Sequence, residues 1–295
     1  MDSLSLFIDS GAFSAYTKNI NISIQDYIDF IKKYKKYINV YANLDVIGDP
    51  KQTLKNQIIM EDSGLSPIPC FHYKEDFNYL KYYLKKYDYI ALGGMVKVIE
   101  NKRINFLDQC FNIICHTKNR LPKVKVHGFG MTSFRIMKKY PWYSCDSTTW
   151  VIGARTGGVI IPRMVNGEYV YDEHCYRVMI SNKHPDYMKS WGKHYNMYSP
   201  LTQRIINKWI HKMGYCIGES IIKDVNSNYR LRKGERFFNK EKTKVEKIIR
   251  EGVINNYKMR DEVNIRFFIN FEKTIPPWPW SFKYKYKNKI KGFEI

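Results

Sequence analysis

Short apolar runs alternate with amphipathic segments along the first 150 residues. Each run is rich in β-branched or aromatic residues, and a loop that carries glycine or aspartate follows it. This alternation is typical of βαβ units that build a parallel sheet. The predicted strands are Leu4–Ile8, Ile38–Leu44, Ile68–Phe71, Tyr89–Leu92, Val124–Val126 and Trp142–Cys145. The predicted helices between them are Ile24–Tyr37, Gln52–Ser63, Asp76–Tyr87, Ile104–Thr117 and Ser133–Tyr140.

The number of these units bears on the fold class. Six units in 150 residues favour an α/β fold of the (β/α)8 TIM-like barrel type, because every strand of such a barrel ends in a loop at the same face. A doubly wound sheet is the alternative. We expect the barrel to occupy residues 1–215. We expect a basic C-terminal region, residues 216–295, to pack on the barrel and to bind nucleic acid.

The pattern weakens after residue 150. A hairpin is predicted from Val159–Pro162 and Glu168–Tyr171 around Asn166-Gly167, and a helix over Leu201–Met213. Residues 201–295 carry 22 Lys and Arg residues against 10 Asp and Glu residues, and lysines alternate with aromatic residues in the tail. This composition indicates a nucleic-acid surface, with a solvated helix face and a frayed tail as the alternative. The basic residues singled out are Arg230, Arg232, Lys233 and Arg236.

The whole chain of 295 residues has a formal net charge of +21. Such an excess points to a polyanionic partner, most commonly nucleic acid, although an AT-rich genome also enriches lysine. The sequence shows neither a secretory signal nor an apolar run of the 18 residues that a membrane span needs, so no membrane partner is expected. Six cysteines without CxxC spacing predict reduced thiols and a cytoplasmic location, the host cytoplasm if a phage encodes the chain. Their spacing does not support a metal site; the one alternative is Cys175 with His174 and His194.

Two aspartates stand directly after apolar runs. Asp9 follows Leu6–Ile8, and Asp146 follows Trp142–Cys145. An acid at the carboxyl end of a buried strand is costly to desolvate, so it usually has a partner or a chemical role. Either aspartate could instead cap the helix that follows it. Two such acids in a strand-rich region predict one active site assembled from distant strand ends.

Further strand-end loops could complete that site. Glycines let the backbone approach a flat ligand, Phe13 could cover a ring, and Asp45 could accept hydrogen bonds from ring N–H groups. Taken singly, each glycine could equally well be a turn residue, and His72 and His127 could each be a structural histidine whose hydrogen bonds are satisfied in the core. The candidate binding residues are Ser10, Gly11, Phe13, Asp45, His72, Gly93, Gly94, Met95, His127 and Gly128.

In this order, the loops resemble the motifs of the tRNA-guanine transglycosylases. Asp9-Ser-Gly-Ala-Phe13 is similar to the family's Asp-Ser-Gly-Gly-aromatic motif, and Ala42-Asn-Leu-Asp45 to its second aspartate strand. Pro69-Cys-Phe-His72 resembles the strand that ends in a glutamine in that family. Ala91-Leu-Gly-Gly-Met95 resembles its Gly-Gly-Leu loop, and Val126-His-Gly-Phe-Gly130 its Met-Gly-Val-Gly loop. The resemblance covers about residues 6–160.

The most telling match ends this series. Asp146 falls where the family has its nucleophile, and Arg155-Thr-Gly157 follows at the family's Arg-x-Gly spacing. The sequence departs from the family pattern in three respects. It shows no counterpart of the segment that precedes the Asp-Ser-Gly-Gly strand, it lacks the Cys-x-Cys-x-x-Cys zinc cluster, and His72 and His127 replace a glutamine and a methionine. These features make it most similar to the compact phage and bacterial DNA-guanine transglycosylases.

The resemblance implies a base exchange in DNA that needs neither a metal nor another cofactor. Asp146 would attack C1′ of a deoxyguanosine, and Asp9 would carry the proton. Ser10, Asp45, Gly94 and the ring of Phe13 would orient an incoming 7-deazaguanine, such as a cyano- or amido-substituted form. The nucleotide would be flipped or single-stranded, with Arg155 near it. A tRNA substrate and a non-catalytic nucleic-acid-binding paralogue are the alternatives, and the oligomeric state, including a homodimer, is left open.

Overall fold

A computed structural model describes residues 5–18, 20–131, 133–184, 193–226 and 228–283. The chain divides into two compact units. Unit 1 comprises Met1–Ser147 and Pro276–Ile295, and unit 2 comprises Thr148–Ile275. Unit 2 is therefore an insertion in the sequence of unit 1. The domain boundary expected at residues 215/216 stays a prediction.

Short parallel strands form the centre of unit 1. The first two pair with each other, and the next four pair in chain order. A parallel bridge between Ala42 and Ile68 joins the two groups. Each strand overlaps a predicted one, because buried β-branched and aromatic runs favour extended chain. The strands are β1 (Phe7–Ile8), β2 (Val40–Tyr41), β3 (Cys70–His72), β4 (Tyr89–Gly93), β5 (Lys125–Gly128) and β6 (Ser144–Cys145).

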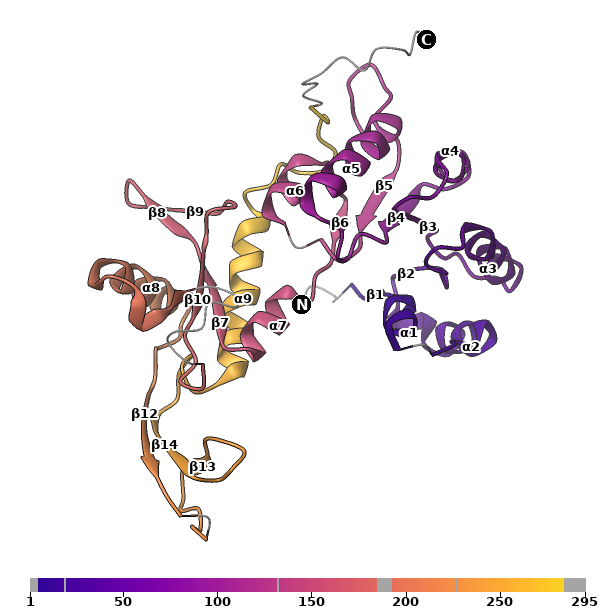
Figure 1. The fold of residues 1–295 in the computed structure, drawn as a ribbon. Helices are drawn as coiled ribbons and strands as arrows, with labels where there is room; N and C mark the ends of the chain where they lie inside the picture. Colours follow the sequence, from indigo (N-terminus) through magenta and orange to yellow (C-terminus); the bar gives the residue numbers. More distant parts are fainter. Residues whose placement is uncertain (1–4, 19, 132, 185–192, 227, 284–295) are drawn as a thin grey trace. The chain divides into compact units, whose positions relative to one another are not determined.

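Helices connect these strands, and Figure 1 shows α2 to α5 on the outer side of the row of strands. Several helices begin at a side-chain cap, such as Asp49 before α3 and Asp76 before α4, whose carboxylates accept backbone N–H groups. The helices are α1 (Ala12–Lys18), α2 (Ile24–Tyr34), α3 (Pro50–Asp62), α4 (Phe77–Lys86), α5 (Glu100–Ile114) and α6 (Phe134–Lys139), with a 3₁₀ turn η1 (Lys35–Tyr37).

The sheet of unit 1 curls strongly. Phe7 on β1 stacks on His127 of β5, with the two ring centroids 4.2 Å apart. In a flat sheet these two strands, four places apart, would be separated by about 19 Å. The inward side chains of distant strands therefore meet inside the curl. The architecture is mixed α/β with a parallel sheet, and no pairing that closes it into a barrel is found within the described ranges.

Unit 2 is built around a small mixed sheet of order β11-β10-β7, flanked by helices. A second sheet, of order β12-β14-β13, is wholly antiparallel. The strands are β7 (Gly158–Ile161), β8 (Arg163–Val165), β9 (Glu168–Val170), β10 (Tyr176–Met179), β11 (Lys193–His194), β12 (Glu219–Asp224), β13 (Glu235–Phe237) and β14 (Lys244–Arg250). The helices are α7 (Thr149–Arg155), α8 (Pro200–Lys212) and α9 (Tyr257–Glu272), with a 3₁₀ turn η2 (Tyr195–Met197).

The predicted hairpin is correct in its turn and wrong in its first strand. Asn166-Gly167 does join two antiparallel strands, β8 and β9. The run before Pro162, however, is β7, which pairs with β10 instead. Proline has no N–H for a sheet ladder, so it separates β7 from β8 and lets the chain change partners.

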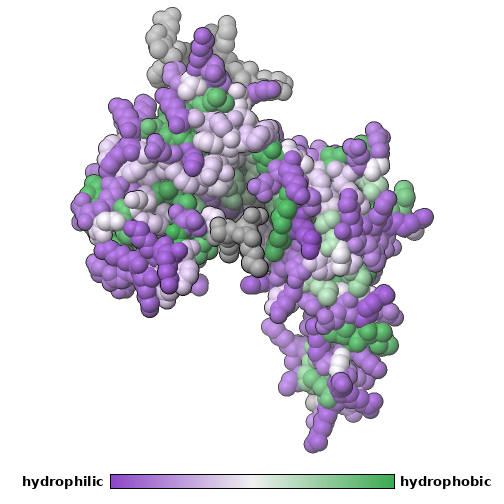
Figure 2. Space-filling view, turned by 180° about the vertical axis from the view of Figure 1, so that it is seen from behind, coloured by the Kyte–Doolittle hydropathy of each residue, from purple (hydrophilic) through white to green (hydrophobic). Residues whose placement is uncertain are grey.

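The basic C-terminal region is divided between the two units. Residues 216–275 form strands β12 to β14 and helix α9 in unit 2, whereas the segment from Pro276 onward belongs to unit 1. There Phe282 is 1% exposed and stacks on Tyr140. The lysines after Lys283 lie outside the described residues. On the face seen in Figure 2, most side chains are hydrophilic, and none of the described helices is long and apolar enough to cross a membrane.

Candidate active site

Three aspartates come together at the carboxyl ends of the unit 1 strands. Asp9 directly follows β1, Asp146 directly follows β6, and Asp45 lies in the loop after β2. Burial raises the pKa of Asp9, and the charges of Asp45 and Asp146 raise it further, while the N–H groups of Gly11 and Ser10 act in the opposite direction. Like charges raise a carboxyl pKa only at close range, so the three acids share one site.

One carboxylate oxygen of Asp146 is held by a hydrogen bond, and the side chain remains accessible to solvent. The N–H of Gly130 donates to Asp146 Oδ1 over 2.6 Å, and the N–H of Asp146 donates to the carbonyl of Gly128 over 3.2 Å. Its side chain is 47% exposed. Burial raises the pKa of Asp146, and the hydrogen bond from Gly130 opposes that rise. The arrangement presents a fixed carboxylate oxygen to an incoming ligand.

Asp45 is clamped by two side chains. The Ser10 hydroxyl donates to Oδ1 over 2.8 Å, and Nε2 of His72 lies 2.8 Å from Oδ2. Nδ1 of His72 in turn lies 2.8 Å from Oε1 of Glu75, whose Oε2 accepts the backbone N–H of His72. Both ring nitrogens of His72 are therefore used inside the protein, and Asp45 has a fixed orientation.

His72 is a buried imidazolium in this chain of contacts. Burial disfavours its charge, but the neighbouring Cys70 sulfur and the carboxylates of Asp45 and Glu75 outweigh burial and raise its pKa. Burial also raises the pKa of the Cys70 thiol to about 11, so that thiol is uncharged at neutral pH. We therefore attribute the raised pKa of His72 chiefly to the two carboxylates.

Among the described residues, the donor atoms of Asp45, Cys70 and His72 lie within 4.8 Å of one another, close enough in principle to surround a metal ion. Ligands around a tetrahedral zinc ion stand about 3.3 Å or more apart. The 2.8 Å between His72 Nε2 and Asp45 Oδ2 is instead a hydrogen-bond distance. The alternative set predicted from the sequence, Cys175 with His174 and His194, does not form such a group within the described ranges.

His127 lies beside Asp146 and is uncharged. Its Nδ1 is 2.7 Å from the Ser144 hydroxyl, and its ring is stacked on Phe7. Burial lowers the pKa of His127 to about 4. Its Nε2 is buried, lies 3.8 Å from Asp146 Oδ1 and has no hydrogen-bond partner among the described residues. An unpaired buried nitrogen beside an exposed carboxylate is suited to bind a ligand atom.

The glycines of the strand-end loops have a clear packing role. Gly94 has φ +70°, and a Cβ there would lie 3.0 Å from Cβ of His72. Only glycine lets the loop after β4 lie this close to His72 in that conformation. Gly93 and Gly128 also lie against core side chains, and Met95 is buried. Contact of these residues with a base stays a prediction.

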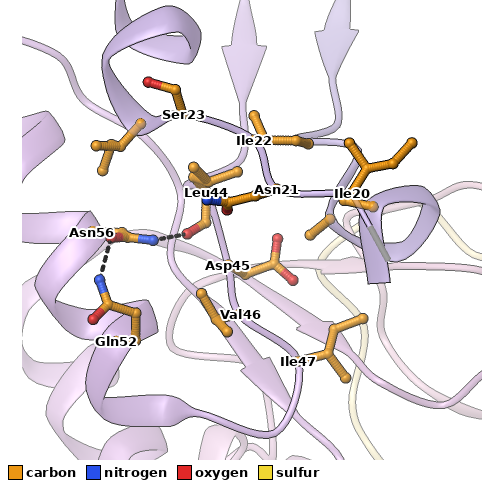
Figure 3. Close-up of a pocket in the computed structure, with 13 residues that line it drawn as sticks. Ile20, Asn21, Ile22, Ser23, Leu44, Asp45, Val46, Ile47, Gln52 and Asn56 are labelled. Atoms are coloured by element: carbon orange, nitrogen blue, oxygen red, sulfur yellow. Dashed lines mark hydrogen bonds between the residues drawn. The ribbon is translucent and has the colours of Figure 1, made fainter. Parts of the chain in front are cut away.

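A pocket of about 470 Å³ opens beside α1 and the loop after β2. Figure 3 shows Asp45 in its wall among Ile20, Val46 and Ile47. Asp45 therefore links the acid cluster to a mainly apolar cavity of the size that small molecules occupy. Gly11 lies just before α1, while Phe13 is 41% exposed on α1 and does not line this pocket.

The predicted nucleic-acid residues all lie in unit 2. Arg155 ends α7, and the structure brings it together with Arg236 in one pocket. Arg230, Arg232 and Lys233 instead lie exposed in the turn between β12 and β13.

Sequence reasoning missed the residues that support the aspartates. Glu75 could have been found, because His-x-x-Glu at the end of a strand allows the two side chains to meet. The hydroxyls of Ser144 and Tyr89, which are 2.6 Å apart behind His127, left no recognisable signal. Comparison with protein-family models, with curated proteins and with solved structures finds no match. The function is therefore argued from the site itself.

Proposed function

We propose that the protein is a pentosyltransferase that exchanges guanine in DNA for a 7-deazaguanine derivative. The observation that carries this proposal is the meeting of three aspartates from separate strand ends with unequal surroundings. Asp146 is accessible and fixed by one N–H, Asp45 is clamped, and Asp9 has a pKa raised by burial and by the other two. Such differences divide the roles of nucleophile, base reader and proton carrier.

In the first step, a carboxylate oxygen of Asp146 attacks C1′ of the deoxyguanosine. The C1′–N9 bond breaks, and its electron pair leaves with guanine. Asp9 gives that base a proton, and its raised pKa favours the protonated form that this step requires. The product is a covalent ester between Asp146 and the sugar, and free guanine departs.

In the second step, N9 of the incoming 7-deazaguanine attacks C1′ and displaces Asp146. Its N9 proton passes to Asp9, so the enzyme returns to its starting protonation state. Two displacements retain the configuration at C1′. Asp45 accepts N–H groups of the base, and Nε2 of His127 offers one more polar contact beside Asp146. The pocket beside Asp45 provides apolar walls for the base.

We also propose that the curled sheet belongs to a (β/α)8-type barrel. Six parallel strands with helices outside, and the ring contact between Phe7 and His127, support that proposal. In such barrels the catalytic residues lie at the carboxyl ends of the strands, as the three aspartates do here. A DNA substrate places the reaction in the cytoplasm, or in the host cytoplasm if a phage encodes the chain.

Substitution of the nucleophile tests the proposal. Asp146→Asn should lower base exchange by at least about a thousandfold, because loss of a nucleophile removes the covalent step. Single-stranded DNA binding should stay nearly unchanged, since the side chain keeps its shape. The measurement is mass analysis of nucleosides from DNA and tRNA of cells that make 7-deazaguanines and express each variant.

Asp76→Asn is the matched control. Asp76 also follows a strand and caps the next helix, and asparagine caps equally well, so this variant should exchange bases like the wild type. Exchange by Asp146→Asn at the wild-type rate would remove the nucleophile assignment. A modified base in tRNA alone would contradict a DNA substrate, and nucleic-acid binding without exchange in either pool would favour the non-catalytic alternative.

A further inference from the structure

Unit 2 contains a pocket of about 470 Å³ whose charged side chains are mostly cationic. Its wall includes the guanidinium groups of Arg155, Arg236 and Arg260 and the ammonium group of Lys183. These residues come from α7, β13, α9 and the loop after β10. Four cations separated by up to 105 positions in the sequence, gathered around one cavity, are costly to assemble unless an anion neutralises them.

Arg260 is the buried base of this pocket. It is 5% exposed, and its Nε and Nη1 donate to the carbonyls of Ala154 and Val253 over 2.7 and 2.6 Å. The described residues give its Nη2 no hydrogen-bond partner. Burial lowers the pKa of Arg260 to about 10. The charge of Arg236 contributes to the lowering, while the carboxylates of Asp261 and Glu246 act in the opposite direction. The guanidinium is therefore rigidly held and only partly neutralised.

Arg236 and Arg155 form the remainder of the cationic wall. Arg236 donates to the buried Glu246 and to the carbonyl of Asn255. Among the described residues, Glu246 is the one carboxylate that is hydrogen-bonded to a cation of this pocket. The described residues give Arg155 no ion pair. Arg155 and Lys183 are both exposed at the mouth of the pocket.

A close backbone contact sets this geometry. Gly157 has φ +106°, and a Cβ there would lie 2.7 Å from Cβ of Ser181. The N–H groups of Ile180 and Ser181 both donate to the Gly157 carbonyl. Any other residue at 157 would push the end of α7 away from the loop after β10. The Arg155-Thr-Gly157 motif thus has a structural purpose, which is to place Arg155 beside Ser181 and Lys183.

We propose that this pocket binds a backbone phosphate of single-stranded DNA. Guanidinium groups match the geometry of phosphate oxygens, and the hydroxyl of Ser181 in the same wall can donate to them. A phosphodiester would supply negative charge to this set of cationic side chains. The proposal deepens the proposed function, on which its choice of DNA rests, by naming where the strand is held.

The double variant Arg155→Ala/Lys183→Ala tests the pocket without disturbing buried Arg260. Binding of a short fluorescent single-stranded DNA is followed by anisotropy over a series of salt concentrations. Each phosphate that is no longer neutralised lowers the slope of log Kd against log salt by about 0.7 for single strands, so loss of the one phosphate in this pocket should lower it by about 0.7. Arg204→Ala/Lys208→Ala, on exposed positions of α8, removes the same charge from the same unit and should leave the slope unchanged.

Equal slopes for the two double variants would overturn the proposal. So would a loss of binding seen with an RNA oligonucleotide and not with DNA. If inorganic phosphate binds the pocket and the double variant does not affect DNA binding, the pocket serves a free anion and the proposal also fails. The proposed function can fail separately from this proposal. If the protein exchanges no base in any nucleic acid but the double variant still loses DNA binding, the proposed function is wrong and the phosphate site is supported.

Discussion

Two buried histidines beside the aspartates have opposite charge states at neutral pH. His72 lies between the carboxylates of Asp45 and Glu75, which keep it protonated. His127 lies against the ring of Phe7, and burial lowers its pKa to about 4, which keeps it neutral. The same side chain is thus a cation that holds Asp45 in one place and a neutral group beside Asp146 in the other.

This difference predicts opposite effects of pH on stability. For His127, the unfolded chain takes up a proton below about 6.5 and the folded chain only below about 4, so stability falls by up to about 3 kcal/mol as the pH drops through that window. For His72, whose folded pKa is raised, the stabilisation is full below about pH 6.5 and declines as the pH rises above it.

Urea denaturation on both sides of about pH 6.5 tests the two signs. His127→Phe keeps the ring stack and should lose the acid-side decline. His72→Gln should lose the alkaline-side decline and keep the acid-side one. An acid-side decline of full size in His127→Phe would show that another group causes it.

At the scale of elements, hydrophobic periodicity predicted the strands and most helices of unit 1. Three of the described helices were not predicted from the sequence, namely α1 in unit 1 and α7 and α9 in unit 2. In α1, Ala12 is the one buried hydrophobic residue among the positions whose burial is described, so the sequence offers no apolar stripe at helical spacing there. In α9, the buried positions include Arg260 and Asn264 as well as Val263, Phe267 and Phe271. Polar residues on the inner face break the apolar pattern from which a helix is predicted.

The site was predictable in part for a similar physical reason. Each aspartate was marked by its place after an apolar strand, and parallel strands bring such ends to one edge. The clamp on Asp45 depends on contacts between different strand ends, and the cationic pocket depends on the path of unit 2. Neither leaves a local pattern, because those partners are far apart in the sequence.

Asn264 shows how much one buried polar residue of α9 supports. Its Oδ1 accepts the N–H of Ile160 in β7, and its Nδ2 donates to the carbonyl of Trp150 in α7. Asn264→Ala should lower the free energy of unfolding of unit 2 by about 1–3 kcal/mol, because the buried N–H of Ile160 loses its hydrogen-bond partner. Asn270→Ala, which loses a bond only within the helix, should change it by less than about 0.5 kcal/mol. Equal effects in chemical denaturation would contradict this role.

At the scale of the whole molecule, both parts of unit 1 must be present for its core to be complete. The N–H of Phe282 donates to the carbonyl of Arg120, and its ring lies against Phe111 and Tyr140. The segment from Pro276 onward thus contributes a buried aromatic side chain to a unit whose other residues end at Ser147.

Phe282→Ala should therefore destabilise unit 1 by about 3–5 kcal/mol, the usual cost of such a cavity. Lys283→Ala, at the exposed neighbouring position, should be nearly neutral. Thermal unfolding of the two variants checks the prediction. Equal melting temperatures would mean that the ring contributes little to the core.

The insertion of unit 2 into unit 1 has a consequence for synthesis on the ribosome. All three aspartates are translated long before Phe282. Until Phe282 emerges, the nascent chain carries all three aspartates but leaves the rings of Phe111 and Tyr140 without the aromatic side chain that packs on them. During that interval the exposed apolar surface can aggregate or bind chaperones. A ribosome that stops before codon 282 releases a chain that contains all three aspartates but lacks the Phe282 side chain that completes the core of unit 1.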